Sequence, residues 1–153
     1  EDGGIITQSG AILEWLEASQ PEPPLLPADA WDRARVRALS NAVACDIHPL
    51  NNLRVLNYLG AGFAADEARK NAWYHHWLRE GFDSLEQQLD GGDFAVGAAP
   101  GMADVYLVPQ IFNALRFRFD MAPYPRLRRV YEACGALEAF ARAHPDAQPD
   151  RPA

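Results

Sequence analysis

The sequence has 153 residues, enough for one domain or for one domain and a fragment of a second. Hydrophobic residues make up 48% and charged residues 23%, which is enough apolar material for a buried core and excludes extensive disorder. The net charge of −7 argues against nucleic acid and anionic membranes as partners, because proteins that bind polyanions carry a basic surface. Two cysteines, Cys45 and Cys134, make neither a disulfide framework nor a zinc site and favour a reducing compartment, the cytoplasm.

The first twenty residues predict the end of a sheet followed by a helix. Residues 2–4 are a turn signal, and the β-branched residues 5–7 are typical of the second strand of a hairpin. Apolar residues at helical spacing then predict a helix that ends near Ser19, with Ser9 as its N-cap. Two interpretations of Gln8 and Ser9 stay open: they bind a carboxylate at the helix N-terminus, or Ser9 is an ordinary cap.

A proline-rich stretch marks a boundary in the chain. Residues 20–30 contain four prolines, which forbid a helix and favour an extended connection. We therefore expect residues 1–20 to end one domain, residues 21–30 to form a linker and residues 31–153 to form a second, all-α domain of five or six helices. Three apolar stripes at helical spacing carry this prediction: Trp31, Ala34, Ala38, Leu39, Ala42 and Val43; Trp73, Trp77, Leu78, Gly81, Phe82, Leu85 and Leu89; Met102, Val105, Tyr106, Ile111, Phe112 and Leu115.

The segment 45–54 (CDIHPLNNLR) combines a predicted helix break with several polar side chains, and it is the most informative stretch of the sequence. Pro49 disfavours helical geometry at His48, so the helix kinks there, or ends and restarts, and backbone N–H groups become available to an anion. On a regular helix His48 and Asn52 share a face, whereas Arg54 points elsewhere. The alternative is a capping histidine, surface asparagines and a solvated arginine around a packing kink.

Asp104 and Arg116 are the remaining polar candidates in the helical part. Asp104 follows Pro-Gly-Met-Ala at a predicted helix start, where its carboxylate accepts backbone N–H groups, so we expect a structural role. Arg116, near the end of that helix, binds a substrate carboxylate or simply favours the helix C-terminus. His75 and His76 are adjacent and point about 100° apart on a helix, so no metal site is predicted.

These features together resemble the zeta class of glutathione transferases, the maleylacetoacetate and maleylpyruvate isomerases. The resemblance covers essentially the whole sequence, from the last strand and helix of a thioredoxin-like domain through the helical C-terminal domain. The sequence departs from the family at Gly10, where members have a larger apolar residue, and at Gly101, where they have Thr or Ser. The motifs that carry the resemblance are residues 8–17 (QSGAILEWLE), 46–54 (DIHPLNNLR), 104–110 (DVYLVPQ) and 123–125 (PYP).

The resemblance implies a homodimeric cytoplasmic enzyme of tyrosine and phenylalanine catabolism. Such an enzyme uses glutathione as a coenzyme to isomerise maleylacetoacetate, a small dicarboxylate, to fumarylacetoacetate, and maleylpyruvate from gentisate breakdown is the alternative substrate. It further implies that His48, Arg54 and Arg116 contact the substrate. Arginine suits a substrate carboxylate because its guanidinium pairs with it through two hydrogen bonds. The glutathione contacts that it implies are Gln8, Ser9, His48, Asn52, Leu53 and Arg54.

The thiol-activating Ser or Cys of the family belongs to a part of the thioredoxin-like domain that precedes Gln8. No catalytic residue is therefore expected within the 153 residues, and we expect this chain alone to be inactive. A different class of function also stays open, a non-catalytic interaction module of transferase fold. Such a module has no reason to keep Gln8, Ser9, His48 and Asn52 polar.

Overall fold

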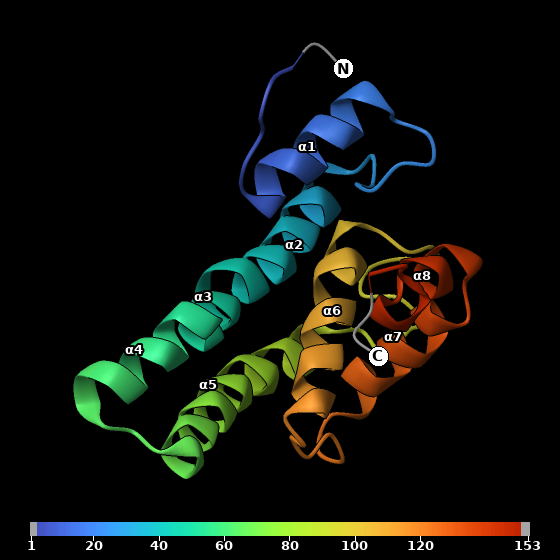
Figure 1. Ribbon diagram of the computed structural model, residues 1–153. Coiled ribbons are helices and arrows are strands. Elements are labelled where there is room, and N and C mark those ends of the chain that lie inside the picture. The colour runs from blue at the N-terminus through green and yellow to red at the C-terminus, as the bar shows by residue number, and fades with distance from the viewer. Residues whose placement is uncertain (1–2, 151–153) are drawn as a thin grey trace.

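The computed structural model describes residues 3–150, and all regular secondary structure in this part of the chain is helical, in agreement with the predicted all-α domain (Figure 1). No helix within it is both long enough and apolar enough to cross a membrane. The helices follow in this order: α1 (Ser9–Ser19), α2 (Ala30–Asn41), the π-helix η1 (Ala42–Ile47), α3 (His48–Asn51), α4 (Leu53–Phe63), α5 (Glu67–Gln88), α6 (Met102–Arg116), α7 (Pro125–Gly135), α8 (Glu138–Ala143) and the 3₁₀-helix η2 (Pro145–Ala147).

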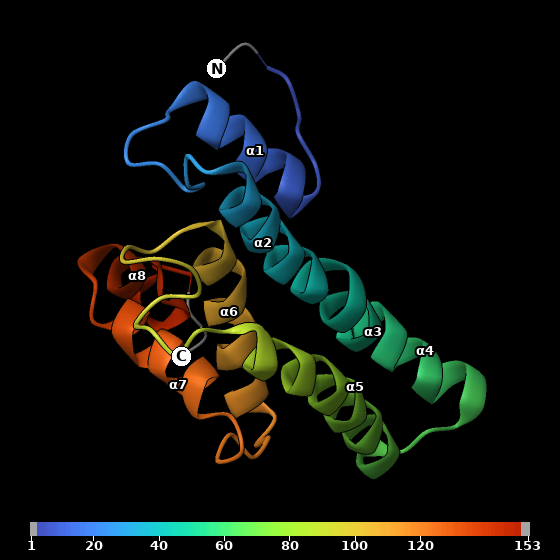
Figure 2. The same cartoon turned by 180° about the vertical axis from the view of Figure 1, so that it is seen from behind.

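Four of these segments, α2, η1, α3 and α4, form one long rod, and α5 returns beside it in the opposite direction (Figures 1 and 2). The interruption predicted around Pro49 is confirmed, because the chain widens into the π-helix just before this residue. A second break falls at Asn52, whose backbone is extended and whose Oδ1 accepts the Arg54 N–H at 3.0 Å as the cap of α4. These breaks raise the number of helices above the five or six expected.

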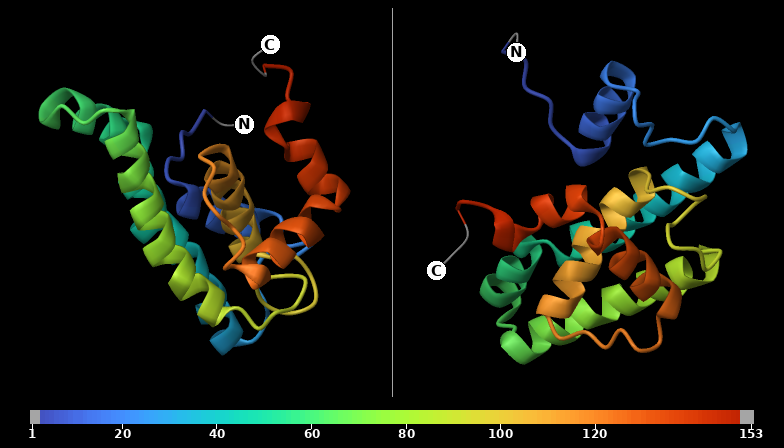
Figure 3. Two further views of the ribbon diagram at one scale, coloured as in Figure 1. Left: turned by 90° about the horizontal axis from the view of Figure 1, so that it is seen from below. Right: turned by 90° about the vertical axis from the view of Figure 1, so that its right-hand side faces the viewer.

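Helix α6 lies between the rod and α7 and packs against both (Figure 3). The core is built from α2, η1, α5, α6 and α7, with Phe82, Leu107 and Leu127 fully buried. Gly81 of α5 faces the side chain of Ile47 in η1, and a Cβ on Gly81 would overlap that side chain. The absence of a side chain at Gly81 therefore lets α5 approach η1 closely.

The linker between α1 and α2 is fixed by specific contacts. The carboxylate of Glu17 accepts the Leu25 N–H at 2.7 Å, and the Leu25 carbonyl accepts the Met102 N–H at 2.8 Å. A Cβ on Gly101 would lie 2.9 Å from that carbonyl oxygen, so Gly101 fits this linker where a larger residue would displace it. Helix α1 is also tied to α2, since Arg37 Nε donates to Glu14 at 2.7 Å.

Two expectations about local structure are wrong. Residues 5–7 form no strand, because no other strand exists within residues 3–150 to pair with them, and Ile5 is exposed. Trp31 does not join the core stripe: it is 74% exposed at the second position of α2, where the helix has just begun. Residue 2 of the predicted turn and residues 151–153 lie outside the described residues.

The structural role expected for Asp104 is confirmed. Its buried carboxylate accepts the Gly101 N–H and the Ala95 N–H, each at 2.8 Å, so it fixes both the start of α6 and the loop before it. Burial raises the pKa of Asp104, and the backbone hydrogen bonds oppose this rise. The thiol of Cys134 in α7 donates to the same carboxylate.

Candidate functional site

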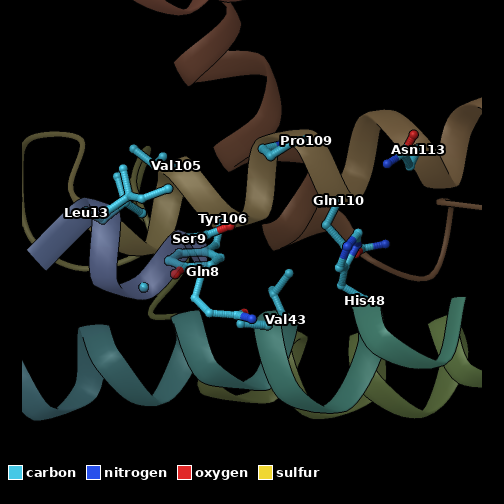
Figure 4. A pocket seen from close by; sticks show the side chains of 13 residues that line it. Gln8, Ser9, Leu13, Val43, His48, Val105, Tyr106, Pro109, Gln110 and Asn113 are labelled. Carbon is cyan, nitrogen blue, oxygen red and sulfur yellow. The ribbon is translucent and has the colours of Figure 1, made fainter. Parts of the chain in front are cut away.

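A cavity of about 610 Å³ opens between α6, the rod and the first turn of α1 (Figure 4). Helix α6 forms one wall, η1 and the start of α3 form the opposite wall, and the beginning of α1 closes one end. Its volume is in the range of sites for small molecules. The lining residues are Gln8, Ser9, Gly10, Ile12, Leu13, Val43, Ala44, His48, Val105, Tyr106, Pro109, Gln110 and Asn113.

Gln8 and Ser9 place polar groups at the α1 end of this cavity. Ser9 is the first residue of the helix rather than its cap, because Gln8 takes the N-cap position with φ 73° and its carbonyl accepts the Ile12 N–H. Neither side chain caps the helix, so the interpretation of Ser9 as an ordinary cap is wrong. No side chain of the N-cap residue accepts the N–H groups of the first turn, so these groups are available to an anion at the cavity. A positive φ at a residue other than glycine is a strained geometry found preferentially at functional sites.

His48 enters the cavity from the opposite wall. It is the first residue of α3, directly after the π-helix, and it points toward the wall formed by α6 (Figure 4). No side chain or backbone group among residues 3–150 forms a hydrogen bond with its ring. The alternative of a capping histidine is therefore not what this chain adopts. His48 shares the cavity with Gln8 and Ser9, as expected of residues that contact one ligand.

Helix α6 contributes polar groups that the sequence pattern did not indicate. Tyr106, Gln110 and Asn113 face the cavity at successive turns, whereas the pattern assigned Tyr106 to an apolar stripe and left the other two unassigned. Burial raises the pKa of Tyr106, with smaller contributions from Cys45 and Glu14, so its hydroxyl is neutral. The spacing of three and four residues between these side chains is the one signal that would have revealed a polar face.

The remaining predicted site residues lie outside the lining of the cavity. Asn52 uses its Oδ1 to cap α4, and Leu53 and Arg54 are exposed on the outer side of the rod. Arg116 is exposed near the end of α6, and its Nη1 donates to Asn113 Oδ1 at 3.3 Å, so it adjoins the cavity through Asn113. Within residues 3–150 no group of three His, Cys, Asp or Glu side chains is arranged to hold a metal ion.

The chain is similar to known proteins over almost its whole length. Residues 57–133 match the family of the glutathione S-transferase C-terminal domain. Maleylpyruvate isomerase of Ralstonia sp is 53% identical over 150 residues, which are 95% of this chain and 71% of that protein.

Two solved structures also superpose closely. The holo structure of maleyl pyruvate isomerase, a bacterial zeta-class glutathione S-transferase, is 52% identical with a TM-score of 0.96, over 98% of this chain and 73% of that one. Maleylacetoacetate isomerase from Anaeromyxobacter dehalogenans, with dicarboxyethyl glutathione and citrate bound in its active site, is 49% identical with a TM-score of 0.93, over 99% of this chain and 70% of that one. The chain therefore belongs to the zeta class of the glutathione transferase family.

Proposed function

We propose that the protein catalyses the glutathione-dependent cis–trans isomerisation of maleylacetoacetate to fumarylacetoacetate. The observation that carries this proposal is a cavity lined by the side chains of Gln8, Ser9 and His48, which form no hydrogen bond within the described chain. The related enzyme of A. dehalogenans holds dicarboxyethyl glutathione, in which the glutathione sulfur is joined to a dicarboxylate through a thioether bond. That ligand has the same chemical parts as the proposed coenzyme and substrate.

The residues at the α1 end of the cavity fit glutathione. The free N–H groups of the first turn, together with the side chains of Gln8 and Ser9, suit the carboxylate of its γ-glutamyl residue. His48 then lies across the cavity, where it contacts glutathione or the substrate. Asn52, Leu53 and Arg54 belong to this proposal on the strength of the family resemblance, and they follow His48 on the same rod.

Bound glutathione supplies a thiolate whose reversible addition to the cis double bond leaves a single bond that rotates before elimination. The chain's own task is to hold the two ends of a dicarboxylate while the bond between them turns. Arg54 and Arg116 are the proposed carboxylate partners, since a guanidinium pairs with a carboxylate through two parallel hydrogen bonds. The apolar part of the wall, Leu13 and Val43 among it, excludes water from the reacting bond.

We further propose that residues 1–20 complete a thioredoxin-like glutathione-binding domain, that residues 21–30 are its linker and that residues 31–153 form the helical domain. Helix α1 supports this division because none of its residues is buried, and Ile12 and Trp15 remain exposed. Two large apolar side chains three residues apart on one exposed helix face suit contact with another part of the same protein.

We also propose that the enzyme is a cytoplasmic homodimer of tyrosine and phenylalanine catabolism. Large apolar side chains remain exposed along the rod, Leu53 and Tyr58 among them, and such a surface suits a second copy of the protein. The mass in solution, measured by light scattering, should be that of a dimer, and Leu53→Glu combined with Tyr58→Glu should reduce it to that of a monomer. A monomeric wild-type protein would contradict this part of the proposal.

Maleylpyruvate is the second candidate substrate, because the Ralstonia relative is a maleylpyruvate isomerase. Turnover of both compounds by the full-length protein at one glutathione concentration separates the two. We expect a higher kcat/KM for maleylacetoacetate, and a preference for maleylpyruvate would reassign the substrate.

The site itself is tested by removing His48 and Arg54 together in the full-length protein. We expect His48→Ala with Arg54→Ala to reduce glutathione-dependent turnover by about 10²-fold or more, the loss typical of a positioned charged contact. His76→Ala is the matched control, because His76 is an exposed histidine of α5 outside the cavity. Unchanged turnover in the double variant would refute the assignment of these residues.

A further inference from the structure

Helix α6 carries two amides and a guanidinium at a spacing of three residues, Gln110, Asn113 and Arg116. Gln110 and Asn113 line the cavity, and Arg116 adjoins it through its hydrogen bond to Asn113. The series therefore runs from neutral donors inside the cavity to a positive charge at its end. A ligand that matches this order carries uncharged carbonyl oxygens inside and a carboxylate at the end.

Gln110 is held firmly although it faces the cavity. Only 4% of its surface is exposed, and its amide forms a hydrogen bond with the Tyr74 hydroxyl. The ring of Tyr74 is stacked on Phe117, with ring centroids 3.9 Å apart. A glutamine amide has two N–H groups, and because one of them donates to the Tyr74 hydroxyl and favours its ionised form, the other remains as a donor for a ligand.

Asn113 controls the direction of Arg116. The guanidinium is exposed and lies 5.9 Å from the ring centroid of Phe112, and its one hydrogen bond among the described residues is to Asn113 Oδ1. Without this bond the side chain would be free to extend into solvent. The Nδ2 group of Asn113 is not used by Arg116, which leaves it as a donor toward the cavity.

We propose that Gln110 and Asn113 are substrate-recognition residues, Gln110 donating to the keto oxygen conjugated with the double bond and Asn113 directing Arg116 toward the terminal carboxylate. The inference rests on the proposed function and names the groups of that site that choose the substrate. When a thiolate adds to the double bond, its electron pair moves onto the conjugated keto oxygen, and the pair returns when the thiolate leaves. Gln110 therefore makes its strongest hydrogen bond as this negative charge develops, whereas the pair of Asn113 and Arg116 acts equally before and during the reaction.

The two residues should consequently give different kinetic signatures in the full-length protein. Gln110→Met keeps the shape of the side chain and removes its donors, so we expect kcat to fall by about 10²-fold with little change in KM. Asn113→Ala should raise KM about 10-fold with little change in kcat, since it weakens ground-state and transition-state binding alike. The matched control is Asn57→Ala, because Asn57 is an exposed asparagine of α4.

A binding experiment separates failure of this inference from failure of the proposed function. Calorimetry with glutathione and with dicarboxyethyl glutathione measures how much the two added carboxylates contribute to affinity. We expect both variants to bind glutathione like the wild type, and Asn113→Ala and Arg116→Ala to lose the added affinity for dicarboxyethyl glutathione. Wild-type protein that does not bind glutathione would overturn the proposed function. Normal glutathione binding with unchanged affinity for dicarboxyethyl glutathione in Asn113→Ala, or unchanged kcat in Gln110→Met, would overturn the inference alone.

Discussion

Replacing Gly81 with alanine tests the close packing that places η1, and with it His48, at the cavity. A Cβ on Gly81 would overlap Cγ1 and Cδ1 of Ile47, and Ile47 is fully buried, so its side chain cannot turn away without displacing its neighbours. Such overpacking costs about 1–3 kcal/mol, whereas the better helix propensity of alanine returns about 1 kcal/mol. We expect Gly81→Ala to lower the free energy of unfolding by up to about 2 kcal/mol.

A double-mutant cycle isolates this contact. Ile47→Ala alone should cost about 2–5 kcal/mol, because it leaves a cavity in the core. In that background the Cβ added by Gly81→Ala meets no Cγ1 or Cδ1, so this substitution should become stabilising by about 1 kcal/mol through helix propensity. The change of sign is the signature of a direct clash, and urea unfolding followed by circular dichroism measures all four proteins.

Gly135 provides the control, since it ends α7 and a Cβ there would meet no atom within 4 Å. Gly135→Ala should stabilise the protein by up to about 1 kcal/mol. If Gly81→Ala stabilised the wild type as much as Gly135→Ala does, the close approach of α5 and η1 would be refuted. Glutathione affinity should fall in Gly81→Ala and stay unchanged in Gly135→Ala, because only the former displaces η1.

Three further substitutions follow from the fold. In Asp104→Asn the new side-chain NH₂ faces one of the two backbone N–H groups that the carboxylate accepts, so that N–H loses its partner. We expect the free energy of unfolding, measured by urea titration, to drop by about 1–3 kcal/mol. Asp93→Asn, at an exposed site, is the control. Burial, followed by the nearby Asp104, raises the pKa of the Cys134 thiol to about 12, so the stability that the neutral thiol contributes is complete below about pH 9 and is lost as the pH rises toward 12. The urea midpoint should therefore fall over this range more in the wild type than in Cys134→Ala, and equal slopes would contradict the assignment. Gly10→Ala should raise the melting temperature, because its Cβ would lie 3.4 Å from the Tyr106 hydroxyl, an ordinary contact, and alanine favours helix α1 by roughly 0.5–1 kcal/mol.

The sequence predicted those features that local chemistry decides. The helical spacing of apolar residues led to the all-α fold, and Pro49 led to the break in the rod, because each depends on neighbours within a few positions. Asp104 was recognised for the same reason, since a carboxylate at the third helical position has a partner at the N-cap. Of the glutathione contacts that the resemblance implied, Gln8, Ser9 and His48 lie around one cavity, whereas Asn52, Leu53 and Arg54 lie outside its lining, so the assignment stays a prediction.

What the sequence could not decide depends on contacts between distant segments. Residues 5–7 have strand-forming side chains, but a strand needs a second strand, and within residues 3–150 none is present. Trp31 fits the helical spacing of an apolar stripe, but it is exposed. Which residues of the stripe are buried depends on where α6 packs against α2. Gln110 was not assigned a role because a polar residue within an apolar helix says nothing about which neighbour it faces.

The polar side chains of the core and those at the cavity differ in whether the protein itself supplies their hydrogen-bond partners. Ser40 and Asp104 are paired within the protein, with the Ser40 hydroxyl bonded to the Val36 carbonyl and the Asp104 carboxylate to two backbone N–H groups, so their hydrogen bonds serve the fold. Ser9 and His48 are exposed at the cavity and form no side-chain hydrogen bond within residues 3–150, so both side chains are available to a ligand. The segments that carry them, α1 and α3, are far apart in sequence, and the position of η1 directly before α3 depends on the packing of Ile47 against Gly81 of α5. Recognition in this protein is consequently as sensitive to its packing as to the residues that touch the ligand.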